Sequence, residues 1–310
     1  MRAYLAMPLD KHHSISAEQV QETHGTEPAC SVLKALQALR SFRGLSGKGP
    51  PRDPDAVRAL LLNGWTSEVR LHLIDLEDTE RLWLANHGAP IDAYYATSRM
   101  ASAFLCIRDT AVPDNHGKLL RAVSALAVDQ RLLPSPWNLA CVTITPTPTY
   151  TGFPIEPGYC SNLASQADPY ARAGMMLRTT RKRGVEAKVQ AAKRRLKQKR
   201  APNGEQRRQD AQMAATTVFD FAWRMRTRSN HGDPAMYYAG TLSPERSSAF
   251  ATSIRVWTEA TMALFEALIA ERARGLVEET AVHFISRDRS GIAERLIAPR
   301  LKALGMLARH

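Results

Sequence analysis

The sequence has few cysteines and no long apolar run, and these absences exclude several classes of protein. Its four cysteines are scattered, without a CxxC pair or a histidine at ligand spacing, which excludes a zinc knuckle and a disulfide scaffold. No apolar stretch approaches the roughly 18 residues of a membrane span, and charge begins too early for a secretory signal. We therefore expect a cytoplasmic protein with no membrane partner, no metal and no cofactor.

Acidic residues are also scarce relative to basic ones. The chain has 30 Asp and Glu against 42 Lys and Arg, a formal charge of +12. Residues 178–208 alone hold 13 basic and two acidic residues, a net charge of +11, so the remaining 279 residues carry only +1. The protein is therefore a nearly neutral chain that contains one strongly basic segment.

The apolar residues predict an all-α fold. Their share, 44% of the chain, is enough to form a substantial core. They recur at helical spacing over most of the sequence, which predicts helices over 29–42, 55–65, 68–88, 91–107, 114–133, 170–200, 211–228, 243–273 and 291–307. The helix predicted over 243–273 should begin with Ser243 as its cap and Pro244 at its first position. Prolines flank the possible strand at 141–145, so it can only be an isolated or edge piece.

Changes in composition suggest where the chain is divided. A linker rich in Gly and Pro covers 44–54 and closes a polar N-terminal segment, residues 1–54, that contains one short helix. We expect a helical domain over 55–275 and further helices over 276–310. An insertion at about 134–210, first irregular and rich in Pro and then basic, interrupts the helical domain.

One motif suggests chemistry. Arg226 and His231 stand five positions apart where a predicted helix ends, and Gly232 and Pro234 are strong signals for that end. The pair alone is not specific, because random placement of the abundant arginines yields roughly three such matches and the chain contains three. The alternative role for His231 is to cap the helix, where its ring would favour the last carbonyls.

Together with two other segments, this motif resembles the HEPN superfamily of all-α domains. The three segments are Ala93-Tyr94-Tyr95-Ala96, Asp114-Asn115-His116-Gly117 and Arg226 through Asp233. With their flanking helices they span about residues 57–275. The resemblance implies an HEPN-like helical bundle and a metal-independent ribonuclease of defence or toxin type. It implies a dimer whose two R-x4-H segments face each other, with Arg226 and His231 catalytic and with supporting residues Thr227, Asn230 and Asp233.

These residue types suit the cleavage of RNA by its own 2′-hydroxyl group. A histidine with a pKa near 6.5 can give or take a proton at neutral pH. An arginine stays cationic and can hold the developing charge on phosphate oxygens. Here His231 would move the proton and Arg226 would hold the charge. His116 is expected to be a helix cap or dimer-surface residue, and Tyr94 and Tyr95 are expected to pack between helices.

The basic segment predicts a nucleic-acid partner, with RNA favoured. Its density of cations suits phosphate contacts and counterion release, whereas its lack of aromatic residues argues against base stacking. The alternative is a solvated helix without a ligand. The residues expected to bind nucleic acid are Arg181, Lys182, Arg183, Lys193, Arg194, Arg195, Lys197, Lys199 and Arg200.

Three functions are thus compatible with the sequence. The first is the ribonuclease, acting on RNA as a homodimer. The second is a non-catalytic nucleic-acid-binding subunit that keeps an HEPN-like scaffold within a larger complex. The third is a helical regulator or antitoxin-like partner, which leaves the basic segment without a purpose.

Overall fold

The all-α prediction is confirmed. In the computed structural model, 76% of the described residues are helical and 2% lie in strands. No helix in this part of the chain has both the length and the apolar character of a membrane span. The described residues are 26–45, 51–73, 75–76, 78, 81–108, 113–144, 169–197, 200, 203–231 and 243–307.

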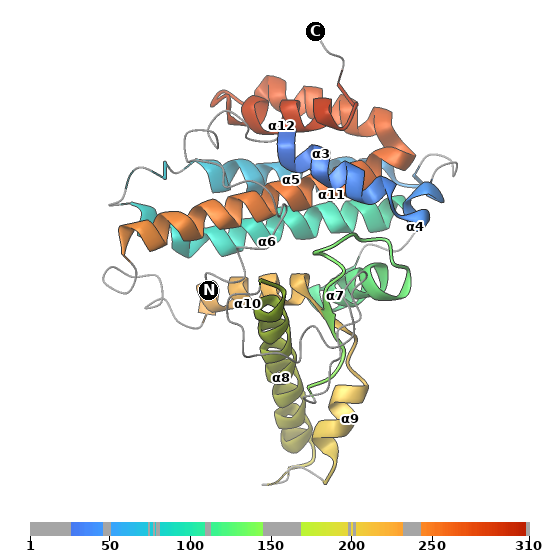
Figure 1. Ribbon diagram of the computed structural model, residues 1–310, viewed down its shortest axis with the longest axis vertical. Coiled ribbons are helices and arrows are strands. Elements are labelled where there is room, and N and C mark those ends of the chain that lie inside the picture. The colour runs from blue at the N-terminus through green and yellow to red at the C-terminus, as the bar shows by residue number, and fades with distance from the viewer. Residues whose placement is uncertain are drawn as a thin grey trace. The chain divides into compact units, whose positions relative to one another are not determined.

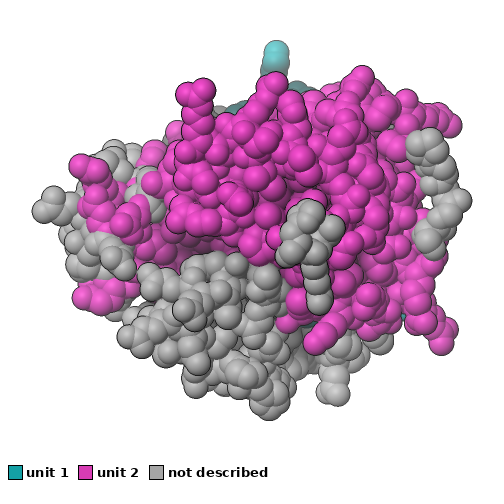
Figure 2. Space-filling view, turned by 90° about the horizontal axis from the view of Figure 1, so that it is seen from above, with its two compact units in different colours: residues 1–7, 120–224 teal, residues 8–119, 225–310 magenta. Residues whose placement is uncertain are grey.

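The chain forms two compact units, coloured separately in Figure 2. Unit 1 consists of residues 1–7 and 120–224, and unit 2 of residues 8–119 and 225–310. The expected insertion at 134–210 falls inside unit 1. Two helices, α7 (His116–Ser124) and α10 (Val218–His231), begin in one unit and end in the other.

Unit 2 is a bundle of long helices. In Figure 1, α5, α6 and α11 run side by side, and α3 and α12 pack against α11. The bundle therefore includes α3 from the expected N-terminal segment and α12 from the expected C-terminal segment. The helices of unit 2 are α3 (Thr26–Gln37), α4 (Arg40–Arg43), α5 (Pro54–His72), α6 (Leu82–Ile107), α11 (Pro244–Arg287) and α12 (Ile292–Ala303).

Unit 1 is built around α8 (Pro169–Arg195), which packs against α9 (Glu205–Ala211) and a small sheet. The sheet consists of β1 (Ala140–Cys141) and β2 (Thr216–Thr217), paired antiparallel with Ala140 opposite Thr217. A short π-helical turn, η1 (Ala125–Asp129), follows α7. The expected strand is thus a two-residue piece in a two-stranded sheet.

Residues at their N-terminal ends explain where α5 and α11 begin. Asp53 caps α5, because its Oδ1 accepts from the backbone N–H of Ala56 at 2.9 Å, and Pro54 occupies the first helical position. At α11, Pro244 again stands first, and Ser247 N–H donates to the carbonyl of Ser243 at 2.9 Å. The start predicted at Ser243 and Pro244 is therefore confirmed.

Three boundaries differ from the sequence prediction. Thr66, which falls in the gap between the helices predicted at 55–65 and 68–88, lies within α5, where its hydroxyl donates to the carbonyl of Leu62. Pro90 lies inside α6, because packing against α5 and α11 outweighs the one backbone hydrogen bond that a proline removes. The end predicted at Ala273 is a kink, with φ −145° and ψ 46°, after which α11 continues.

Small residues allow α5 and α6 to approach closely. A Cβ atom at Gly64 of α5 would lie 3.0 Å from Sδ of Met100 and 3.3 Å from the carbonyl oxygen of Ala96. Both contacts are shorter than packed atoms normally make, so a larger residue at Gly64 would push α6 away. This close contact fixes the α6 turns that carry Tyr94 and Tyr95.

Candidate functional site

The first candidate site is the exposed face of α8 and the turn after it. We define the basic surface as the seven cations that are exposed there. They are Lys182, Arg183, Lys188, Arg194, Arg195, Lys197 and Arg200. Lys193, also expected to bind nucleic acid, is half-buried, and Lys199 lies outside the described residues.

One acidic side chain, Glu205, is engaged with other residues of α9. Hydrogen bonds from Arg208 and Gln209, together with the positive charges of Arg208 and Arg195, lower the pKa of Glu205 to about 2. Glu205 is thus ionised at neutral pH, and its carboxylate is occupied by residues of its own helix.

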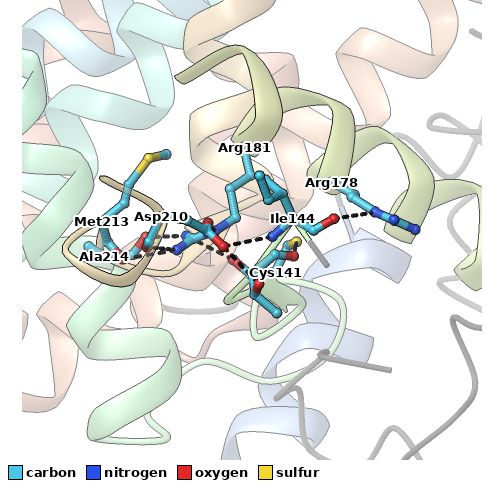
Figure 3. Close-up of polar contacts among 8 residues, drawn as sticks. Cys141, Ile144, Arg178, Arg181, Asp210, Met213 and Ala214 are labelled. Carbon is cyan, nitrogen blue, oxygen red and sulfur yellow. Dashed lines mark hydrogen bonds and ion pairs between the residues drawn. The ribbon is translucent and has the colours of Figure 1, made fainter. Parts of the chain in front are cut away.

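Arg181 is not part of this surface, although the sequence placed it there. Its side chain is 1% exposed, and its Nε donates to Oδ1 of Asp210 at 2.6 Å. Its two other nitrogens donate to four backbone carbonyls, as Figure 3 shows in part. All five N–H groups of the guanidinium are used inside unit 1. The expectation that Arg181 contacts nucleic acid is therefore corrected: its side chain joins α8 to α9, to β1 and to the turn that follows α9.

Asp210 completes this buried network. Its Oδ2 accepts from the Thr143 hydroxyl at 2.7 Å and from the Ile144 N–H at 3.1 Å. Burial alone would raise the pKa of Asp210, but hydrogen bonds from Thr143, Ile144 and Arg181 outweigh burial and hold that pKa below its usual value. The network presents α8 in a fixed orientation within unit 1.

Two arginines on α8 should therefore respond very differently to the same substitution. Arg181→Met is expected to lower the free energy of unfolding by about 2–3 kcal/mol, because it deprives Asp210 and four carbonyls of their donor. Arg183→Met, on the exposed side, is expected to change it by less than about 0.5 kcal/mol. Urea unfolding followed by circular dichroism measures both values. Equal losses in the two variants would contradict the structural role of Arg181.

The second candidate site, in unit 2, joins residues from three helices. We define the Arg226 cluster as Tyr94 and Tyr95 of α6, His116 of α7 and Arg226 of α10. Nη2 of Arg226 donates to the Tyr95 hydroxyl at 2.6 Å, and its guanidinium carbon lies 5.3 Å from the centre of the Tyr95 ring. The Tyr94 hydroxyl and Nδ1 of His116 are hydrogen-bonded at 2.8 Å. The ring centres of His116 and Tyr95 lie 6.3 Å apart.

Two cations act on the imidazole of His116. Burial is the largest influence that lowers the pKa of this imidazole, and the charges of Arg226 and Arg99 lower it further. The ring is therefore neutral at pH 7 and above. It lies next to a fixed cation, a combination that can bind an anion and exchange a proton with it.

Both residues of the R-x4-H motif lie on α10, which continues to His231. Positions five apart on a helix lie about 140° around its axis. Thr227 is half-buried and Asn230 is exposed; the His231 side chain and Asp233 lie outside the described residues.

His116 is the residue that sequence reasoning undervalued. The cap of α7 is Asn115, whose side-chain oxygen accepts from the Lys118 N–H at 3.0 Å, whereas the His116 ring is hydrogen-bonded to Tyr94 of the cluster. One signal could have found this arrangement. The three segments that carry the HEPN resemblance contain Tyr94 and Tyr95, His116 and Arg226, and these segments are the ones that meet.

Neither metal ligands nor known relatives identify the site. In the described ranges, no group of three or more His, Cys, Asp or Glu side chains is placed to hold a metal ion. Comparisons of the chain with protein-family models, with curated proteins and with solved structures found no match. A function must therefore be argued from the basic surface and the Arg226 cluster themselves.

Proposed function

We propose that this protein binds nucleic acid, with RNA the favoured partner, through the basic surface of α8. The observation that supports this most directly is the exposure of seven cations over residues 182–200. Such a surface gains affinity by releasing the counterions that condense on phosphates. A helix that had only to remain soluble would not need so many cations of one sign.

The dimensions of α8 suit a phosphate backbone. Lys182 and Arg195 are 13 residues apart, which is about 20 Å along a helix axis. A strand of a duplex presents one phosphate per roughly 3.4 Å, so about six phosphates of one strand lie within that length. Because residues 178–208 contain no aromatic side chain, recognition would depend on the backbone and not on base sequence.

Removing part of the basic surface should weaken binding and reduce its dependence on salt. In the variant with Lys182, Arg183, Arg194 and Arg195 replaced by Gln, we expect affinity for a single-stranded RNA oligonucleotide to fall at least about tenfold at 0.1 M salt. The slope of log K against log salt should shrink by up to about 3, since each single-strand phosphate contact contributes about 0.7. Fluorescence anisotropy over a range of salt concentrations measures both quantities.

A matched variant separates the surface from net charge. Arg287, Arg289, Arg295 and Lys302 are exposed cations of unit 2, and replacing these four by Gln lowers the net charge equally. The control should keep the salt slope of the natural protein. Unchanged affinity in the α8 variant, or an equal loss in both variants, would remove the proposed binding surface.

A second function, metal-independent cleavage of RNA, is favoured by the Arg226 cluster. It supplies a guanidinium cation oriented by the Tyr95 hydroxyl and ring. Cleavage by 2′-hydroxyl attack needs such a cation and, in addition, a group that moves a proton. Arg226 would hold charge on the phosphate and His231 would move the proton, in a dimer of defence or toxin type, with Thr227, Asn230 and Asp233 in support.

Binding and cleavage are separate proposals because they rest on different residues. A protein that binds RNA through α8 and leaves it intact would be a non-catalytic nucleic-acid-binding subunit of a larger complex. Incubation of RNA with the protein in excess chelator distinguishes the two functions.

A further inference from the structure

One buried carboxyl group of unit 2 lacks the hydrogen bonds that burial normally requires. Glu259 lies on α11 and is 2% exposed. Its Oε1 is buried and accepts no hydrogen bond from the described residues. That oxygen lies 3.3 Å from Nε2 of His72, the last residue of α5. Because buried polar groups are nearly always hydrogen-bonded, this exception requires a physical reason.

The surroundings of Glu259 hold a proton on it. Burial raises the pKa of its carboxyl group to about 7, and the charge of Glu68 on α5 raises it too, against the opposing charges of Arg300 on α12 and Arg255 on α11. Helices α3 and α6 also pack on α11, but no charge from their described residues is among these influences. At neutral pH this group is therefore about half protonated, whereas an exposed glutamate is ionised.

The same carboxyl group lies where the end of α5 docks on α11. The two helices run side by side (Figure 1). Nε of Arg255 donates to the carbonyl of Leu71 at 3.2 Å, and Leu71 is buried. One residue further on, the His72 side chain is 11% exposed and faces the Glu259 side chain, which is 3% exposed. The last turn of α5 is therefore held by polar groups that adjoin a titrating carboxyl.

One proton between Glu259 and His72 suits this arrangement. A protonated carboxyl group is neutral, and a protonated imidazole compensates a carboxylate; either form can place a hydrogen between the two atoms. Without that proton, a carboxylate is buried near the carboxylate of Glu68, which is costly. Its charge also attracts Arg255, four positions earlier on the same helix, away from the carbonyl of Leu71. Opening the end of α5 would let water reach the carboxylate.

We propose that the last turn of α5 is a pH-sensitive latch on α11, closed while one proton is held between His72 and Glu259 and weakened as that proton is lost between pH 5 and pH 8. The sign follows from linkage. The pKa of Glu259 is about 7 in the closed state and returns toward the ordinary 4.5 when water enters, so the closed state is favoured most below 4.5 and loses this advantage as pH rises to about 7. The constant for closing falls by up to about 10²-fold over that range.

Hydrogen exchange of the full chain, followed by mass spectrometry at pH 5 and pH 8, tests the latch. After correction for the intrinsic exchange rates, protection of the amides of residues 69–72 should fall at least about tenfold from pH 5 to pH 8. Protection of residues 174–181, in α8 of unit 1, should change less than about threefold. Equal protection of 69–72 at the two pH values overturns the latch, and so does a fall of the same size in α8.

A matched pair of variants assigns the effect to one carboxyl group. Glu259→Gln keeps the shape of the side chain but cannot ionise, so residues 69–72 should show no fall in protection between pH 5 and pH 8. Glu294→Gln, exposed on α12, removes the same charge and should keep the fall of the natural chain. A full fall in Glu259→Gln would mean that another group titrates and would overturn the proposal. If Glu259→Gln does not fold, the comparison of 69–72 with α8 in the natural chain still decides.

Discussion

In excess chelator, the protein is expected to cleave single-stranded RNA, and Arg226→Ala is expected to lower the rate by about 10²- to 10³-fold. The loss is large because a preorganised cation stabilises charge that develops only in the transition state. The products should be 2′,3′-cyclic phosphate and 5′-hydroxyl ends: the 2′-oxygen forms the new bond to phosphorus, and the leaving 5′-oxygen receives a proton. Gel analysis of an end-labelled RNA measures the rates and identifies the ends.

Histidine variants then identify the proton-transfer residue. His231→Ala is expected to lower the rate about 10²- to 10⁴-fold, the usual contribution of a general acid or base. His283→Ala, the control on α11, should leave it unchanged. If Arg226→Ala and His231→Ala, both shown to be folded, cleave as fast as the natural chain, the enzyme proposal fails and the non-catalytic binding function remains.

Helical periodicity and helix-start signals predicted much of the architecture. Apolar spacing located the long helices, and Ser243 followed by Pro244 marked the start of α11 correctly. These signals are local, since they depend on residues within one or two turns of each other. The boundaries that failed are those where packing overrides local preference, such as Pro90 within α6.

Residues whose role depends on distant partners were harder to place. Arg181 and Arg183 have the same chemistry and stand two positions apart. Arg181 is buried and hydrogen-bonded to Asp210, whereas Arg183 is exposed. The sequence shows a cation at both positions and does not show which side of α8 meets α9. Likewise, His116 and Arg226 become neighbours only because α6, α7 and α10 meet, a contact between segments that no periodicity reveals.

The largest stability loss should follow removal of Arg300, whose role no local sequence pattern predicts. It lies on α12 and is 1% exposed, between Glu68 of α5 and Glu266 of α11, which are both fully buried. Its nitrogens donate to Glu68 at 2.6 and 2.8 Å and to Glu266 at 2.7 Å. Glu266 also accepts from the indole N–H of Trp65 at 2.8 Å. One arginine therefore joins three helices of unit 2.

Arg300→Met is expected to lower the free energy of unfolding by about 3–5 kcal/mol, because it leaves two buried carboxylates without a cation. Arg295→Met, exposed on the same helix, should change it by less than about 0.5 kcal/mol. Urea unfolding followed by circular dichroism gives both values. Arg300→Lys should be intermediate, because an ammonium keeps the charge but cannot form two paired hydrogen bonds.

The pH dependence of that loss provides a sharper test. Burial already raises the pKa of Glu68, and Arg300 opposes this rise; without the arginine, the folded-state pKa moves further above the unfolded value. Such a carboxyl group binds more protons when folded, so stability falls as pH rises. The variant should therefore lose more stability at pH 8 than at pH 5. An equal loss at both pH values would show that Arg300 contributes packing and not charge compensation.

A triple variant tests the same idea from the other side. Replacing Arg300 and Glu68 by Met and Glu266 by Gln, which still accepts from Trp65, should recover much of the stability lost in Arg300→Met.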